Sequence, residues 1–177
     1  MIAHRGLLTV VMAAALALAG CGATPGDRRL ETAADGAVGP TATGGGYNFT
    51  VATLDGATFD GHSLAGRPAV LWFWAPWCPT CLGQAKQVNG LAADYAGKAT
   101  VVGVAGLGAV PEMHEFVDLA RLSGFPQLAD EQGVVWKRFG ITAQSTFVVL
   151  DAEGTVTASG HLDPAELPGR LDELLVG

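Results

Sequence analysis

The segment AVLWFWAPWCPTC, residues 69–81, carries more structural information than any other part of the chain. Its first six residues are apolar, which is typical of a strand buried on both faces of a sheet. Two cysteines separated by two residues follow a short turn, and residues 82–96 have a helix-compatible composition. A C-x-x-C pair that opens a helix directly after a buried strand favours a nucleophilic thiol over a merely buried one.

The positions of the two cysteines predict different roles. Cys78 falls at or just before the expected helix N-terminus, where unpaired backbone N–H groups and the helix dipole stabilise a thiolate. C-x-x-C sites lower the pKa of a cysteine from about 8.5 to roughly 3.5–7.5. Pro79 suits an early helical position, because its missing N–H costs no hydrogen bond there. Cys81 lies one turn into the helix, so we expect Cys78 to attack and Cys81 to resolve the mixed disulfide.

Three other interpretations of this pair fit the sequence less well. A zinc site needs four ligands, but the third cysteine, Cys21, lies far upstream and the histidines are scattered, so we expect no metal. A purely structural disulfide across a two-residue gap closes almost no loop and would stabilise little. Two inert core thiols would leave the surrounding Trp-Cys-Pro-x-Cys context unexplained.

Cys21 has its own explanation at the start of the chain. A short basic start precedes an apolar run of about fourteen residues, 6–19, which suits a signal sequence and is short for a bilayer span. The run leads into LAGC at 18–21, which looks like a bacterial lipobox, whose cysteine is acylated and becomes the mature N-terminus. Residues 1–20 are therefore predicted to be a lipoprotein signal peptide, and Cys21 the lipidation site. An ordinary secretory signal and an uncleaved anchor remain alternatives.

Residues 21–46 are predicted to be a flexible linker, because they are rich in Gly, Ala and Thr and lack apolar periodicity. About 25 flexible residues span roughly 25–30 Å, so the folded part would stay bound to the extracytoplasmic side of the cell membrane. The net charge is −7 and the acidic residues are scattered, so no basic face is offered to nucleic acid. Membrane attachment would therefore depend on the lipid.

Residues 47–177 are long enough for one core and too short for two. Their apolar patterns predict strands at 48–53, 69–74, 100–105, 146–150 and 155–160, helices at 81–96, 111–123 and from about 168 onward, and a helical turn at 134–139. This order predicts an α/β fold with a mixed central sheet, in which two early parallel strands and a later antiparallel hairpin lie between helices on both faces.

The domain resembles a thioredoxin fold of the TlpA/ResA/DsbE family, and within it the secreted DsbE- and DsbF-like thiol–disulfide oxidoreductase lipoproteins. The resemblance rests on residues 68–81, 101–107, 125–130 and 135–136 and covers the whole domain. It implies a thioredoxin-like domain over 47–177 that exchanges disulfides with extracytoplasmic proteins and with a redox partner protein. It carries over firmly only onto the catalytic pair, Cys78 and Cys81.

One departure from that family concerns a proline. Relatives place a cis-proline just before the strand that here is 147–150, whereas residues 127–163 contain no proline and Ser145 takes the position. A cis bond before a non-proline residue costs about 2.5–4 kcal/mol. The Gln144–Ser145 bond is therefore expected to be trans, or cis under strain imposed by the fold. Either way, substrate docking beside the redox pair should differ from that of the relatives.

A second departure concerns an acid. Relatives often carry Glu three residues after the second cysteine, where a buried carboxylate can accept the proton of the resolving thiol. This chain has Gln84 there, and an amide cannot titrate. We expect slower resolution by Cys81 and a weaker pH dependence of exchange. The alternative is a neutral replacement, with water carrying the proton.

The sequence thus predicts an extracytoplasmic, membrane-anchored disulfide oxidoreductase that is monomeric, needs no cofactor and acts through a CPTC pair. The residues expected to bind substrate or tune the pair are Trp77, Pro79, Thr80, Gln84 and Ser145. One alternative is a thioredoxin-fold binding module with little turnover, in which the surface around Trp77 recruits a partner. A peroxide-reducing redoxin fits less well, because peroxiredoxins need Thr/Ser-x-x-Cys with an arginine nearby. The direction of exchange depends on the redox potential, which the sequence does not set.

Overall fold

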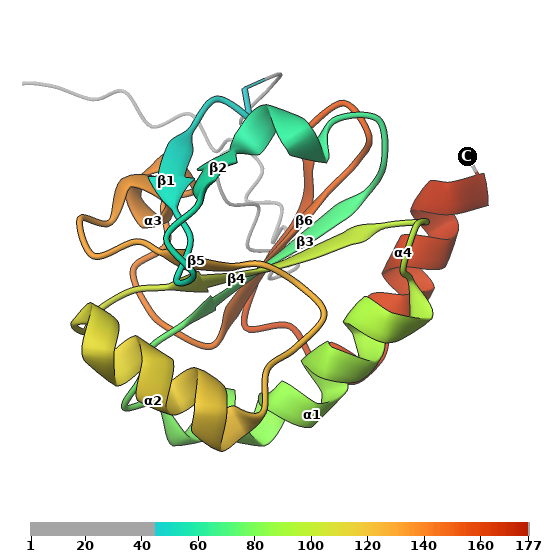
Figure 1. Ribbon diagram of the computed structural model, residues 1–177. Coiled ribbons are helices and arrows are strands. Elements are labelled where there is room, and N and C mark those ends of the chain that lie inside the picture. Colours follow the sequence, from blue (N-terminus) through green and yellow to red (C-terminus); the bar gives the residue numbers. More distant parts are fainter. Residues whose placement is uncertain (1–44, 177) are drawn as a thin grey trace, which may run out of the picture. The chain divides into compact units, whose positions relative to one another are not determined.

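The fold is built around β3 (Ala69–Trp74), whose six residues are all buried. The computed structural model describes residues 45–176 (Figure 1). β3 occupies the middle of a five-stranded sheet of order β5-β4-β3-β6-β7. An apolar residue at every position lets the strand fill the core on both of its faces, as its composition predicts.

The predicted strands of the sheet have the directions that the sequence indicates, parallel for the early pair and antiparallel for the later hairpin. β3 pairs in parallel with β4, and β4 pairs in parallel with β5. On its other side β3 pairs antiparallel with β6, which forms a hairpin with β7. The bounds of these strands are Thr100–Ala105 for β4, Gln127–Ala129 for β5, Thr146–Leu150 for β6 and Val156–Gly160 for β7.

Helices and short segments lie on both faces of the sheet (Figure 1), which confirms the predicted α/β arrangement. A separate hydrophobic cluster fills the space on each face. One face packs against the three longer helices: α1 (Pro79–Asp94), α2 (Val110–Ala120) and α4 (Leu167–Val176). The other face packs against shorter pieces: α3 (Val134–Arg138), the 3₁₀ turn η1 (Gly61–Leu64) and residues of the N-terminal segment. A second 3₁₀ turn, η2 (Pro164–Glu166), leads into α4.

The structure corrects the predicted strands in two places. The strand expected at 48–53 is shortened to β1 (Thr50–Ala52), which pairs with an unpredicted strand, β2 (Thr58–Asp60), in a separate two-stranded sheet. β5 was also not predicted. β2 and β5 have three residues each, too few for an alternation of apolar and polar residues to be recognised. Pairing with a neighbouring strand defines both of them.

Two helices also differ from the prediction at their boundaries. α1 runs from Pro79 to Asp94 rather than over 81–96, so Cys78 caps the helix and Cys81 lies in its first turn. α2 ends at Ala120 rather than at residue 123, because Arg121 has a left-handed backbone (φ 53°) that closes the helix.

The predictions made for the start of the chain fall outside the described residues. They comprise the signal peptide, the lipidation of Cys21 and almost all of the linker. Within residues 45–176, no helix is both long and apolar enough to cross a bilayer. Gly45 and Gly46 already contact the folded part, since Asn48 N donates to Gly45 O and Arg138 Nε to Gly46 O.

Candidate redox site

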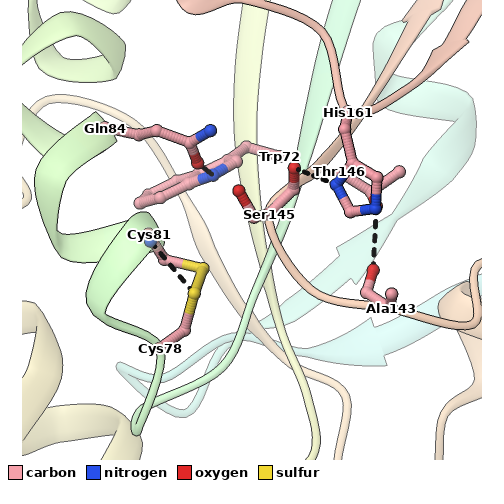
Figure 2. Close-up of a disulfide and its surroundings, with 8 residues drawn as sticks. All are labelled: Trp72, Cys78, Cys81, Gln84, Ala143, Ser145, Thr146 and His161. Atoms are coloured by element: carbon pink, nitrogen blue, oxygen red, sulfur yellow. Dashed lines mark hydrogen bonds between the residues drawn. A yellow bond between two sulfur atoms is a disulfide. The ribbon is translucent and has the colours of Figure 1, made fainter.

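The two cysteines lie at the N-terminus of α1, and the structure pairs them in a disulfide with a Cα–Cα distance of 5.3 Å (Figure 2). Cys78 is the N-cap residue, with an extended backbone, and Pro79 is the first helical residue. The backbone N–H of Cys81 donates to Cys78 Sγ at 3.0 Å. The sulfur thus takes the place of the side-chain oxygen that usually caps a helix. Both predicted positions, Cys78 at the helix start and Cys81 one turn in, are confirmed.

The two sulfurs lie at the edge of the core. Cys78 is 3% exposed and Cys81 is fully buried. Cys78 also lines a surface groove, whereas Cys81 does not. Of the two cysteines, Cys78 is therefore the one that borders the groove, and Cys81 lies behind it.

Gln84 lies one turn beyond Cys81 and is fixed by the core. Its Oε1 accepts a hydrogen bond from the indole N–H of Trp72 at 3.1 Å (Figure 2). Trp72 is completely buried in β3 and stacks on Phe147 of β6, with ring centroids 6.5 Å apart. Gln84 also lines the groove at Cys78. The Trp72 N–H thus holds Gln84 beside the redox pair. A carboxylate at this position could accept the same hydrogen bond.

Ser145 faces the redox pair across the groove, and its backbone has a conformation that proline cannot adopt (Figure 2). Its φ is 63°, in the left-handed region, while the proline ring holds φ near −65°. Its backbone N–H donates to Phe73 O at 2.8 Å, a bond that proline cannot make. Proline could therefore not take this position without a change in the loop backbone.

Among the groove residues that sequence reasoning missed, His161 makes a hydrogen bond to a predicted one, Ser145. Its Nδ1 lies 3.1 Å from Ser145 O, and because a carbonyl only accepts, Nδ1 carries the proton of this hydrogen bond (Figure 2). A histidine alone in a loop has no distinguishing spacing in the sequence. The antiparallel pairing of β6 with β7, which places Phe147 opposite Gly160, brings the residue after β7 next to the residue before β6.

The groove joins predicted site residues from two segments, the start of α1 and the loop before β6, with unpredicted residues of a third segment, after β7. It has a volume of about 540 Å³. Its lining residues come from the start of α1, from the loop before β6 and from the segment after β7: Cys78, Thr80, Gln84, Gln144, Ser145, His161, Leu162, Asp163 and Pro164. A groove of this volume, open to solvent and lined in part by Cys78, can accept part of a polypeptide.

Trp77 and Pro79 lie outside this groove, on the exposed surface of the turn. The indole of Trp77 is 57% exposed, although its N–H donates to Leu107 O at 2.8 Å. Pro79 and Thr80 are exposed as well. Among residues 45–176, no three His, Cys, Asp or Glu side chains converge to hold a metal ion.

Comparison with known proteins agrees with this chemistry. The AhpC/TSA family matches residues 46–159 of the chain. The soluble secreted antigen MPT53 of Mycobacterium tuberculosis is 42% identical over 130 residues, which cover 71% of this chain and 74% of MPT53.

Two solved structures share the fold at high identity. MTB DsbF, solved in mixed oxidized and reduced forms, matches with a TM-score of 0.69 and 47% identity over 73% of this chain and 96% of DsbF. A secreted M. tuberculosis disulfide oxidoreductase homologous to E. coli DsbE matches with a TM-score of 0.66 and 40% identity, over 72% of this chain and 97% of that one.

The chain belongs to the AhpC/TSA family and has its thioredoxin-like fold. Within the family it is a thiol–disulfide oxidoreductase of the DsbE/DsbF type, with the Cys78–Cys81 pair at the N-terminus of α1. The predicted resemblance, fold and enzyme class are confirmed.

Proposed function

We propose that this protein exchanges disulfides with extracytoplasmic protein substrates while anchored to the bacterial cell membrane. The observation that carries the proposal is the placement of Cys78. Its sulfur accepts a helix N-terminal N–H, and Cys78 lines an open groove of about 540 Å³, while Cys81 is buried and does not line it. Protein thiols and disulfides fit such a groove better than a small peroxide, which would need no extended surface.

The reaction follows in two balanced steps. With the pair reduced, the Cys78 thiolate attacks a substrate disulfide, forms a mixed disulfide and releases one substrate thiolate. The Cys81 thiol then loses its proton and displaces the second substrate thiolate from Cys78 Sγ, which leaves the protein oxidised and the substrate reduced. The reverse sequence oxidises a substrate dithiol. A redox partner protein restores the starting state in either direction.

Five further side chains bind substrate or tune the pair in this proposal. Thr80 and Ser145 border the groove on either side of Cys78, and Pro79 sets the helix start. Trp77 offers an exposed apolar surface next to the attacking cysteine. Gln84 stands where an acid would assist Cys81, so resolution by Cys81 is slow in this proposal.

The location proposed for the protein rests on its first 46 residues. A lipidated Cys21 after a 1–20 signal peptide would leave a 21–46 linker and the domain outside the cytoplasm, as a monomer on the membrane. The secreted nature of MPT53 supports the extracytoplasmic side. Cys21→Ala in the full chain, followed by membrane fractionation, tests the anchor: the variant should leave the membrane fraction, and retention there would contradict lipid attachment.

Catalysis on protein substrates is tested with the purified full chain. We expect it to accelerate insulin reduction by dithiothreitol or the refolding of scrambled ribonuclease, and we expect Cys78→Ser to lose this activity. A rate for the wild-type protein no higher than that of Cys78→Ser would contradict the proposal. That result would favour a thioredoxin-fold recruitment module with little turnover.

A further inference from the structure

A second hollow lies next to the redox turn, on the side of α2. It has a volume of about 270 Å³ and is lined by Pro76, Trp77, Glu112, Glu115, Phe116 and Leu119. This volume is smaller than the roughly 300–1,000 Å³ of a usual small-molecule site, so it suits a single large side chain rather than a whole ligand. None of these residues lines the groove at Ser145. We call it the α2 pocket.

The apolar rim of the α2 pocket is exposed but held in place. Trp77 is 57% exposed and Leu119 is 68% exposed, which is unusual for large apolar side chains so close together. The hydrogen bond from Trp77 Nε1 to Leu107 O fixes the indole. On the inner side, Gly108 lets Pro76 approach Glu112, because a Cβ at this position would collide with the Pro76 ring. Such a preformed apolar hollow binds a partner at little entropic cost.

The polar rim of the pocket is acidic. The Glu112 carboxylate accepts from the Ala109 backbone N–H at 2.9 Å and so caps its own helix. Glu115 makes no side-chain hydrogen bond, and among residues 45–176 no lysine or arginine forms an ion pair with it. Two carboxylates that form no ion pair within residues 45–176 favour the binding of a positively charged group.

We propose that the α2 pocket docks the polypeptide that exchanges disulfides at Cys78, by taking an apolar side chain flanked by lysine or arginine. The proposal rests on the proposed action on protein substrates. Trp77 lines this pocket and is the residue directly before Cys78, so a chain joined to Cys78 Sγ can reach the pocket by passing over Trp77. One flank of that chain lies in the groove at Ser145, and the other reaches over Trp77 onto α2.

The charge of the protein argues against two other occupants. A second copy of this chain carries a net charge of −7 and would bring like charge to the two carboxylates. An anionic lipid surface would be repelled for the same reason. A polypeptide segment with basic and apolar side chains complements both the acidic rim and the apolar rim of the α2 pocket.

The test measures exchange between the reduced full-length protein and two symmetrical peptide disulfides. The peptides share one cysteine and one leucine and differ only in carrying two lysines or two glutamates beside them. For each variant, the kcat/KM for the peptide is divided by the kcat/KM for a small neutral disulfide, bis(2-hydroxyethyl) disulfide. This ratio removes changes in the reactivity of the redox pair itself. The variants are Glu115→Gln and Leu119→Ser, with Asp118→Asn as the control. Asp118 is an exposed acid on the same helix that does not line the pocket.

We expect the wild-type protein to prefer the lysine peptide. Glu115→Gln should lower the kcat/KM for this peptide by about two- to fivefold, a size usual for one partly exposed ion pair, and added salt should have the same effect. Leu119→Ser should lower the kcat/KM for both peptides by about fivefold. Asp118→Asn should keep the wild-type preference.

Two results would overturn the docking proposal while leaving disulfide exchange intact. One is equal kcat/KM for the two peptides in the wild-type protein. The other is an equal loss of preference in Asp118→Asn and Glu115→Gln, which would show a general effect of net charge. Failure to exchange with either peptide, with normal reaction of the small disulfide, would instead contradict the action on polypeptides.

Discussion

The two ends of helix α1 use their unpaired backbone groups and side chains for different purposes. At the N-terminal end, the Cys81 N–H donates to a sulfur, Cys78 Sγ, that can leave and return during a reaction. At the C-terminal end, the hydroxyl of Tyr95 lies within hydrogen-bonding distance of Pro168 O (2.9 Å) and Asp172 Oδ1 (2.8 Å), which ties α1 to α4. One end is arranged for chemistry and the other for stability.

This difference predicts that substitutions at the two ends separate activity from stability. Changes near Cys78 should alter exchange rates and leave unfolding little affected, unless they disturb the loop that faces it. Changes at Tyr95 should do the reverse.

Loss of the attacking sulfur has the largest expected effect on activity. Cys78→Ser should reduce turnover of a protein disulfide to the uncatalysed rate, because a serine hydroxyl is not ionised at neutral pH. The free energy of unfolding should fall by no more than about 2 kcal/mol, since the disulfide closes a very short loop. Turnover assays and urea denaturation of the same samples check both parts. Residual catalysis, or a much larger loss of stability, would show that the two roles are not separated at this end.

Restoring the proline of the relatives should destabilise this protein. Ser145→Pro must abandon the left-handed backbone and the bond from Ser145 N to Phe73 O, which together cost about 3 kcal/mol. Ser145→Gly is the matched control, because glycine keeps both the conformation and the N–H, and it should be as stable as the wild type or about 1 kcal/mol more stable. A Ser145→Pro protein as stable as the wild type in urea would mean that the loop is not set by these two features.

Introducing the acid of the relatives should accelerate the second step. Gln84→Glu places a titratable oxygen where Trp72 already donates, beside Cys81, and should raise the rate of mixed-disulfide resolution by about tenfold. Gln87→Glu, on the exposed side of the same helix, adds the same charge without that position. Stopped-flow measurement of thiol release checks the rates. If both variants resolve at the wild-type rate, the missing acid is a neutral replacement.

The smallest effect is expected at the C-terminal end of α1. Burial raises the pKa of Tyr95 to about 12. The hydrogen bond to Asp172 and the negative charges of Asp172 and Asp94 act in the same direction. The unfolded chain ionises nearer 10, so it releases this proton first. The stability that Tyr95 contributes is therefore fully present below pH 10 and is lost as the pH rises from 10 to about 12.

Tyr95→Phe should test this directly. It should cost about 1 kcal/mol at pH 8, where the hydroxyl bonds are removed, and its stability should fall less than that of the wild type between pH 10 and 12. Exchange rates should stay normal. Tyr47, whose pKa burial also raises, remains in the variant and gives the background slope. An identical alkaline loss in both proteins would contradict the assignment.

The sequence predicts the N-terminal end of α1 well because that end is a local structure. The buried strand, the turn, the proline at the first helical position and the spacing of Cys78 and Cys81 all lie within thirteen adjacent residues, 69–81. Each has a conformational preference that does not depend on distant parts of the chain. The same holds for the long buried strands and for the hairpin of β6 and β7.

Other parts of the molecule could not be predicted, because they depend on contacts between residues that are distant in the sequence. The bond between Tyr95 and Asp172 joins positions 77 residues apart. His161 becomes part of the site only because β7 pairs with β6, and the left-handed backbone of Ser145 has no signature in residue type. β2 and β5 have three residues each, so partner strands rather than local preference define them.

The central claim is that Cys78 attacks and Cys81 resolves, and trapping the mixed disulfide tests it most directly. Reduced Cys81→Ser and Cys78→Ser proteins would each be mixed with a peptide disulfide, quenched with acid and mapped by mass spectrometry. We expect Cys81→Ser to accumulate the peptide on Cys78, and Cys78→Ser to accumulate little on the buried Cys81. Equal or faster trapping on Cys81 would contradict it.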